Sequence, residues 1–328
     1  MVRSTFCAIP TRFGPSAGAA DFRAIITAVS TIQKSDTATM NRLYPTPLPQ
    51  IHPLPEFLAT GKRKQWYEEM KQAMQVPWMG VVTMAYAHYP DFFETLWEGT
   101  RPLVRSQPFV EASEELRLFT ESEAAKLRPP PMVMRLENLG YAEREIAQIS
   151  GMIEIFSHGN FPYLLLATVV RMLLEGAEMN GKIDALPFEG RHAPDVRVPL
   201  VLMETHHADA PTRALYEDVK RTLGLPFVNT DYRALARWPS YFSLAWVDLK
   251  GAVTTPTYDA IRDTIHDRAV KLAAQGLPNP GRLSGAALRA AAGRDASLAE
   301  VLQVSRLFQW LLPGLVTNIA FLRAQLQA

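Results

Sequence analysis

Asp231 and Asn160 are the two residues whose types and positions most clearly suggest chemistry. The chain contains an internal copy of itself, and in that copy Val82 takes the place of Asp231. Leu312 in turn takes the place of Asn160. A carboxylate from one copy and an amide from the other would make one asymmetric polar site in a symmetric scaffold. Spacing alone leaves a structural alternative open, with Asp231 as a first-turn helix acid and Asn160 as a turn or cap residue.

The other polar clusters favour no metal or cofactor site. His206, His207 and Asp209 are close in sequence, but they fall in a polar linker and lack the i,i+4 spacing of a helical ligand pair. Solvated histidines are the better interpretation. The glycines of segment 276–285 form no phosphate-binding fingerprint, because no strand precedes them. We therefore expect neither a metal nor an organic cofactor.

The internal copy is found by shifting the sequence by 149 residues. Positions 67–97 then align with 216–246 without a gap, with nine identities in 31 positions. A weaker match at a shift of 152 aligns Phe156 with Phe308, and Arg171 with Arg323. Similarity at a fixed long spacing indicates a duplicated structural unit.

Both copies carry the pattern of helices. Segments 66–74 and 211–223 have apolar residues three and four apart, and prolines follow each of them. Helices are also expected over 143–156, 162–175, 258–274 and 298–312. Strand signals are few, so we predict an all-α fold in which two pseudo-symmetric helical repeats pack around one cleft.

The expected domain organisation follows from these boundaries. It comprises a poorly packed N-terminal extension over 1–60, repeat 1 over 61–180, a linker over 181–212 and repeat 2 over 213–328. The two repeats should form one compact unit. The proline-rich end of the extension cannot continue a helix, which is why poor packing is expected there.

Composition excludes several classes of function. Hydrophobic residues make up 48% of the chain, charged residues 20%, and the net charge is +1, so nothing favours a nucleic-acid partner. The single cysteine, Cys7, permits neither an internal disulfide nor a thiolate cluster and fits a reducing, cytoplasmic compartment. The most apolar stretch, 161–174, is interrupted by Arg171, so no membrane span is expected.

Three sequence segments together resemble the group I 2-haloacid dehalogenases. They are LPFVNTDYRA at 225–234, its copy VPWMG at 76–80, and NFPY at 160–163, and the likeness extends over about residues 65–328. The resemblance implies an all-α, pseudo-symmetric protein that is usually a homodimer and needs no metal or organic cofactor. It also implies direct displacement of halide by water, without an ester intermediate.

By this resemblance Asp231 is the general base and Asn160 helps to hold the attacking water. An ionised carboxylate can take a proton from water as the oxygen attacks, and an amide can both donate to and accept from that water. Residues implied to line the pocket of a small halogenated carboxylic acid are Trp78, Gly80, Val81, Tyr163, Asn229, Thr230 and Phe308. Val81 stands where relatives often have an aromatic residue. Without the resemblance, Trp78 and Phe308 would be interpreted as core residues.

Asn229 bears on stereochemistry. Members of the family that accept both enantiomers tend to have alanine at this position, two residues before the base, whereas D-specific members have asparagine. The resemblance therefore implies conversion of short D (R)-2-haloacids to L (S)-2-hydroxyacids with inversion. The alternatives are a dehalogenase that accepts both enantiomers and a non-catalytic small-acid binding protein. A cysteine-dependent helical peroxidase or decarboxylase is disfavoured because Cys7 lies outside the repeats.

Overall fold

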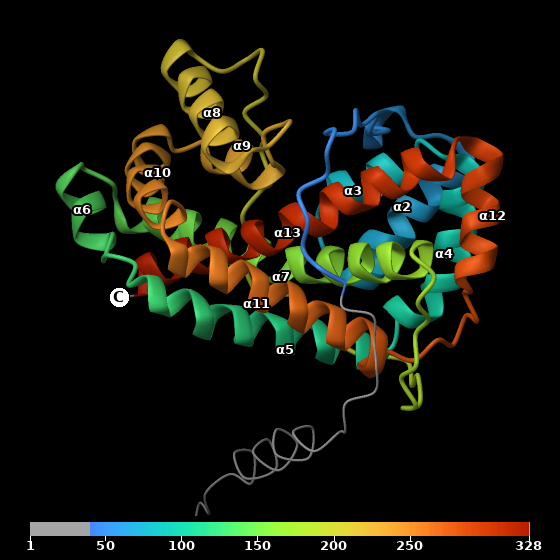
Figure 1. The fold of residues 1–328 in the computed structure, drawn as a ribbon. Helices are drawn as coiled ribbons and strands as arrows, with labels where there is room; N and C mark the ends of the chain where they lie inside the picture. Colours follow the sequence, from blue (N-terminus) through green and yellow to red (C-terminus); the bar gives the residue numbers. More distant parts are fainter. Residues whose placement is uncertain (1–39, 328) are drawn as a thin grey trace, which may run out of the picture. The chain divides into compact units, whose positions relative to one another are not determined.

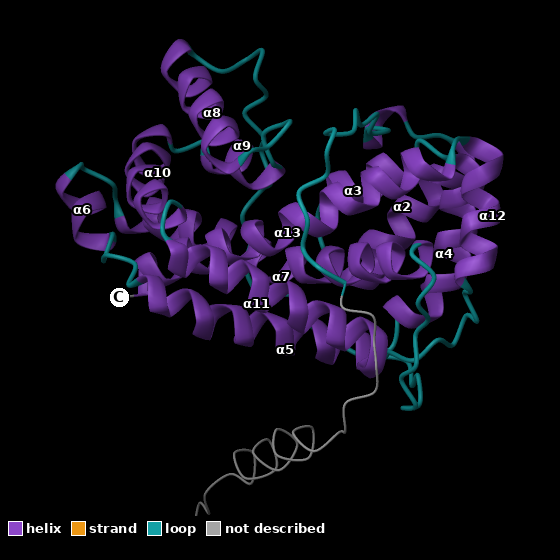
Figure 2. Cartoon of the chain, in the orientation of Figure 1, coloured by secondary structure: helices purple, strands orange, loops and turns teal. Residues whose placement is uncertain are grey.

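The computed structural model describes residues 40–327, and the prediction of an all-α protein is confirmed for them. Helices account for nearly all of the regular structure, and no β-strand occurs between residues 40 and 327 (Figure 2). Cys7 and the rest of segment 1–39 lie outside the described residues.

The helices fall into two successive sets. The first set is α2 (Gly61–Met74), α3 (Val81–Tyr86), α4 (Pro90–Val104), α5 (Gln107–Ala124), α6 (Val133–Asn138) and α7 (Glu143–Leu174). The second is α8 (Ala210–Leu223), α9 (Thr230–Leu235), α10 (Pro239–Val253), α11 (Pro256–Lys271), α12 (Gly285–Asp295) and α13 (Leu298–Gln327). Single turns at Glu56–Leu58, Ala125–Leu127 and Leu272–Gly276 complete the list.

The helix boundaries repeat with the spacing found in the sequence. Helices α2 to α5 begin at residues 61, 81, 90 and 107, and α8 to α11 begin at 210, 230, 239 and 256, in each case 149 residues later. Hydrogen bonds repeat as well. The Tyr67 hydroxyl donates to the Leu54 carbonyl oxygen at 2.9 Å, and the Tyr216 hydroxyl donates to the Met203 carbonyl oxygen at 2.8 Å. The equivalence therefore begins at least at residues 54 and 203, earlier than the expected repeat boundaries.

The segment just after residue 40 packs against the helices, contrary to the expected poor packing. Arg42 forms an ion pair with Asp263 at 2.8 Å. The Tyr44 ring meets the Trp310 ring edge-on, with 4.7 Å between centroids. Prolines keep the segment out of a helix, as expected. An extended, proline-rich chain can still be anchored by its side chains. The proline pattern alone could not show this anchoring.

Helices α7 and α13 form the centre of the described part (Figure 1). Both are buried along most of their length and pack against each other, with α5 and α11 alongside. The alternative that Asn160 is a turn or cap residue does not hold, because α7 runs without a break through segments 143–156 and 162–174 and continues through Pro162. Proline removes one backbone hydrogen bond from a helix. Dense packing around α7 keeps the helix continuous despite that loss.

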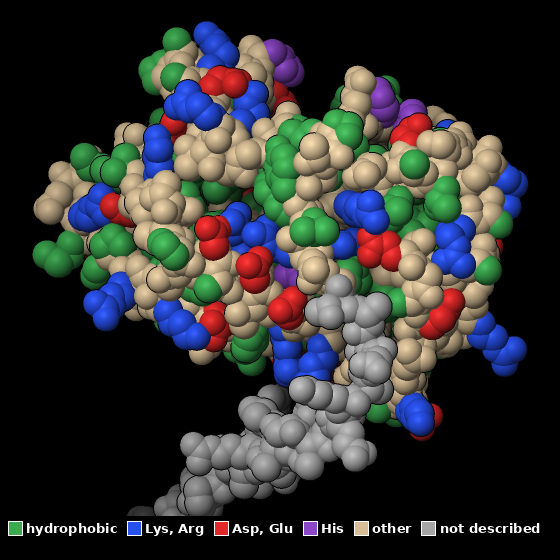
Figure 3. Space-filling model, in the orientation of Figure 1, with side chains coloured by type: hydrophobic (Ala, Val, Ile, Leu, Met, Phe, Trp, Pro, Cys, Tyr) green, Lys and Arg blue, Asp and Glu red, His purple; other side chains and the backbone are tan. Residues whose placement is uncertain are grey.

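Helix α13 is long and apolar enough to cross a membrane. In this protein 89% of its most apolar window is buried inside the structure. Its apolar side chains therefore contact other helices, as in the core helix of a packed helical protein. Charged side chains of both signs are interspersed over the face shown in Figure 3, so that face presents no continuous basic surface.

Candidate active site

The two residues singled out by the sequence meet in the interior. Asn160 lies in the middle of α7, and Asp231 lies in the first turn of α9. The Asn160 Nδ2 atom donates a hydrogen bond of 2.6 Å to Asp231 Oδ1. Only 3% of Asn160 and 2% of Asp231 is exposed to solvent. The structure thus joins an amide and a carboxylate that are 71 residues apart in the chain.

A small cavity of about 30 Å³ lies beside this pair. Its walls contain all nine residues expected at the site: Trp78, Gly80, Val81, Asn160, Tyr163, Asn229, Thr230, Asp231 and Phe308. Five further residues line it and were not expected: Val82, Phe227, Leu311, Leu312 and Leu315. A cavity of this size is large enough to hold a water molecule.

The cavity is built from matching positions of the two copies. Trp78 and Phe227 both line it and are 149 residues apart, as are Val82 and Asp231. Most of the lining residues that were not expected occupy, in the other copy, the positions that match expected residues. The repeat alignment is therefore the signal that could have identified them. Each such pair contributes one wall from each half of the chain, which supports a site on the pseudo-symmetry axis.

Close packing fixes the rings of Trp78 and Tyr163. The Tyr163 hydroxyl donates to the Trp78 carbonyl oxygen at 2.7 Å. A Cβ atom at Gly80 would lie 2.9 Å from the Tyr163 ring, and one at Gly159 would lie 2.3 Å from the Trp78 ring. Both contacts are closer than carbon atoms can approach. Glycine is therefore needed at both positions for the two rings to pack as they do.

Burial makes Asp231 a stronger base than an ordinary aspartate. Loss of solvent raises the pKa of its carboxyl group from 3.8 to about 6. The hydrogen bonds from Asn160 and from its own backbone N–H, with the charge of Arg233, oppose this rise but do not cancel it. Arg233 is itself paired with Glu204 at 2.7 Å. At neutral pH the carboxyl group is therefore ionised, and its pKa lies close to the operating pH, as suits a general base.

Residues 40–327 contain no group of three or more His, Cys, Asp or Glu side chains that could hold a metal ion. Asp209, which lies close to the histidine pair in sequence, serves as the N-cap of α8. Its carboxylate accepts a hydrogen bond of 2.9 Å from the Thr212 backbone N–H.

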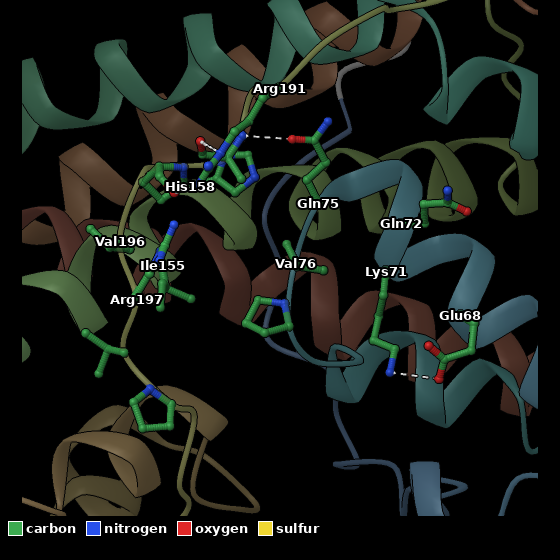
Figure 4. Close-up of a pocket in the computed structure, with 15 residues that line it drawn as sticks. Glu68, Lys71, Gln72, Gln75, Val76, Ile155, His158, Arg191, Val196 and Arg197 are labelled. Carbon is green, nitrogen blue, oxygen red and sulfur yellow. Dashed lines mark hydrogen bonds and ion pairs between the residues drawn. The ribbon is translucent and has the colours of Figure 1, made fainter.

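A larger surface groove, of about 840 Å³, lies between α2, α7 and segment 191–199 (Figure 4). It contains none of the residues of the Asp231 cavity, and its charged side chains are largely paired, as Lys71 is with Glu68 at 2.9 Å. Gln75 accepts hydrogen bonds from the backbone N–H groups of His192 and Ala193, at 2.9 and 3.1 Å. These contacts attach the segment to the end of α2.

Two histidines also contact the end of α2, His158 from α7 and His192 from the segment. His158 Nε2 and His192 Nε2 hydrogen-bond to the carbonyl oxygens of Met74 and Ala73, at 3.1 and 3.2 Å. The last carbonyl groups of a helix otherwise lack partners. Burial and the nearby His192 lower the pKa of His158 to about 4, so its ring is neutral at neutral pH. We interpret the groove as a structural junction and place the chemistry in the smaller cavity.

Comparison with known proteins identifies the family of the chain. Residues 77–226 match the family model described as "Halocarboxylic acid dehydrogenase DehI". An (R)-2-haloacid dehalogenase of Rhizobium sp. (strain NHG3) is 45% identical over 251 residues, which cover 76% of this chain and 97% of that protein. An (R)-2-haloacid dehalogenase of Pseudomonas putida is 37% identical over 279 residues, covering 84% and 92% of the two chains.

A solved structure is also similar. It is described as the complex of a D-2-haloacid dehalogenase mutant with D-2-CPA, and it superposes with a TM-score of 0.79. The identity is 34%, and the match covers 87% of this chain and 99% of that one.

Proposed function

The chain belongs to the 2-haloacid dehalogenase family and is a D-specific hydrolase, and we propose that its reaction is a direct attack by water that Asp231 activates. Short D (R)-2-haloalkanoic acids are converted to L (S)-2-hydroxyacids with inversion. One observation supports this assignment most directly: a buried, basic carboxylate hydrogen-bonded to an amide beside a cavity that can hold water.

The chemistry follows from the residue types. As the water oxygen forms its bond to carbon 2, the carbon–halogen bond breaks and its electron pair leaves with the halide. The proton of the water passes to the Asp231 carboxylate and is later lost to solvent. The Asn160 side chain holds the carboxylate in place through Nδ2, and its carbonyl oxygen can accept from the water.

In-line displacement requires the halide to leave on the side opposite the water. We assign that side to the aromatic wall made by Trp78, Phe227 and Phe308. The rings of Phe227 and Phe308 lie 6.1 Å apart. The indole N–H of Trp78 is a donor that can stabilise a departing anion, while the rings exclude water from the halide.

Enantiomer preference tests the proposed function. The Asn229 side chain lines the cavity and stands where the other copy has Gly80. We propose that its bulk admits only one arrangement of hydrogen and alkyl group at carbon 2. We expect chloride release and L-lactate from D-2-chloropropionate, with the L-enantiomer at least tenfold slower. Replacement Asn229→Ala should admit the L-enantiomer, whereas Asn180→Ala, at an exposed position, should change nothing.

Other outcomes would favour the rival interpretations. Equal turnover of both enantiomers by the wild type would indicate a dehalogenase without stereospecificity. Binding of haloacid without any chloride release would indicate a small-acid binding protein. An unchanged enantiomer preference in Asn229→Ala would remove Asn229 from the role given to it here.

The rate should also depend on pH in a defined direction. Only the ionised form of Asp231 can accept a proton, and burial raises the pKa of this group to about 6. We expect kcat/KM for D-2-chloropropionate to be constant above about pH 7 and to fall as pH drops through 6, approaching about tenfold per pH unit. A profile that stays flat down to pH 5 would contradict the assignment of Asp231 as the base.

The assembly is proposed on the family resemblance, and the location on the single cysteine, Cys7, which fits a reducing compartment. We propose a cytoplasmic homodimer in which each subunit is built from two helical repeats.

A further inference from the structure

A second cavity adjoins the proposed active site. Its volume is about 20 Å³, and it shares three lining residues, Asn229, Leu311 and Leu315, with the cavity beside Asp231. These three side chains therefore separate the two spaces. Beyond them the wall turns polar, with Tyr232, Tyr258, Arg262 and Asn318 among its residues.

Two buried polar atoms in this wall have no hydrogen-bond partner among residues 40–327. They are the acceptor Oδ1 of Asn229 and the donor Nε of Arg262. Only 5% of Asn229 is exposed. Leaving a buried polar atom unsatisfied destabilises the folded state, so such atoms are usually paired with protein or water. Water that donates to Asn229 and accepts from Arg262 would satisfy both.

The far wall of the second cavity is held by a chain of hydrogen bonds. The Tyr258 hydroxyl donates to Asn318 Oδ1 at 2.7 Å, and Asn318 Nδ2 donates to the Tyr232 hydroxyl at 2.8 Å. The Tyr232 hydroxyl thus accepts one bond and keeps its own proton free to donate. A space of this size with three polar groups around it meets the requirements for an ordered water.

This polar lining occurs in only one copy of the repeat. The residues at the matching positions of the first copy are Gly80, Thr83, Phe109, Ser113 and Leu166, in place of Asn229, Tyr232, Tyr258, Arg262 and Asn318. The shift is 149 for the first four and 152 for the last. Each is smaller or less polar than its counterpart. The fold therefore does not require the polar cluster, which accompanies the copy that carries Asp231.

We propose that the second cavity is the water-supply site of the reaction. Each turnover consumes one water, and a bound haloacid fills the cavity from which that water is taken. Water stored behind Asn229 reaches Asp231 past the shared side chains, so the site can receive a water while substrate is bound. Asn229 then both selects the enantiomer and controls the passage of water. This inference rests on the proposed hydrolytic function.

The replacement Gly314→Ala tests the proposal. A Cβ atom at Gly314 would lie 3.2 Å from the Tyr258 hydroxyl and 3.3 Å from Arg262 Cδ, and Gly314 itself lines the second cavity. The added methyl group therefore reduces the space for water. Gly314 lies inside α13, where alanine is a better helix former than glycine, so the change should not weaken the helix.

We expect kcat for D-2-haloacids to fall about tenfold in Gly314→Ala, with little change in KM. A carbon–bromine bond breaks more readily than a carbon–chlorine bond, so the kcat values of 2-bromo- and 2-chloropropionate differ while bond cleavage limits the rate. Once water entry limits the rate, the two values should converge. Gly251→Ala is the matched control, because it is also a helical glycine and nothing lies within 4 Å of the added Cβ.

A high-resolution crystal structure of the wild type supplies the second measurement. We expect an ordered water within hydrogen-bond distance of Asn229 Oδ1, absent in Gly314→Ala. A dry cavity in the wild type would overturn the proposal, as would a Gly314→Ala enzyme with unchanged kcat or with both substrates slowed equally. Absence of halide release from the wild type would instead reject the hydrolytic function itself.

Discussion

Replacing Asp231 by asparagine is expected to abolish measurable halide release while the protein still folds and binds haloacid. The amide has nearly the shape of the carboxylate and can keep the contact with Asn160, but it cannot accept a proton from water. Loss of a general base typically lowers a rate by about 10²–10⁴-fold. Chloride release followed with an ion-selective electrode, beside equilibrium binding of D-2-chloropropionate, measures both effects.

The same variant should be more stable than the wild type. Burial raises the pKa of the Asp231 carboxyl from 3.8 to about 6, so keeping it ionised in the folded state costs about 3 kcal/mol at neutral pH. Below pH 6 the folded protein takes up the proton before the unfolded chain does, and this cost declines as pH falls toward 4. The stabilisation of Asp231→Asn, measured by urea unfolding, should therefore be largest above pH 6 and smaller at pH 4.5.

Asp184→Asn is a suitable control for both measurements, because Asp184 is exposed. It should change neither halide release nor stability by a measurable amount. An Asp231→Asn enzyme that retained more than a tenth of wild-type activity would show that another group activates the water. A variant that unfolded more easily at pH 7 would contradict the proposed cost of the buried carboxylate.

The duplication supplies an internal comparison, and through it the sequence alone could select residues of the candidate site. Asp231 and Asn160 were identified by lacking polar counterparts, and the structure brings them into contact. What the sequence could not show is which packing brings residues of distant segments together. Tyr232 and Asn318 form a buried hydrogen bond across 86 residues. Tyr232 lies in the 225–234 segment, but Asn318 belongs to no motif, so the second cavity is visible only in the folded chain.

The sequence left two interpretations of the aromatic residues open, core packing and pocket lining, and both apply. Trp78 and Phe308 could have belonged to the core or to the pocket. Both are buried, with 4% and 1% of their surface exposed, and both line the cavity. In a site built inside a helical core, the packing residues are themselves the pocket wall. Helical periodicity alone cannot separate the two roles, because it reports only that a side chain points inward.

Replacing Asn160 by leucine, the residue found at its counterpart Leu312, is the second large effect we expect. Leucine has the same number and branching of side-chain heavy atoms as asparagine but cannot orient water, so kcat should fall about 10²-fold or more. The pH profile distinguishes this role from a merely structural one. The hydrogen bond from Asn160 lowers the pKa of Asp231, so its loss should raise that pKa above 6.

The acid limb of the pH profile is the range in which activity falls as pH drops. For the residual activity of Asn160→Leu it should therefore lie at higher pH than in the wild type. Asn180→Leu, the same change at an exposed position, should leave both the rate and the limb in place. A slower Asn160→Leu enzyme with the limb still near pH 6 would mean that Asn160 holds the water without acting on the base. A limb that moved without loss of rate above pH 8 would mean the reverse, because the only effect of Asn160 would then be on the proton affinity of Asp231.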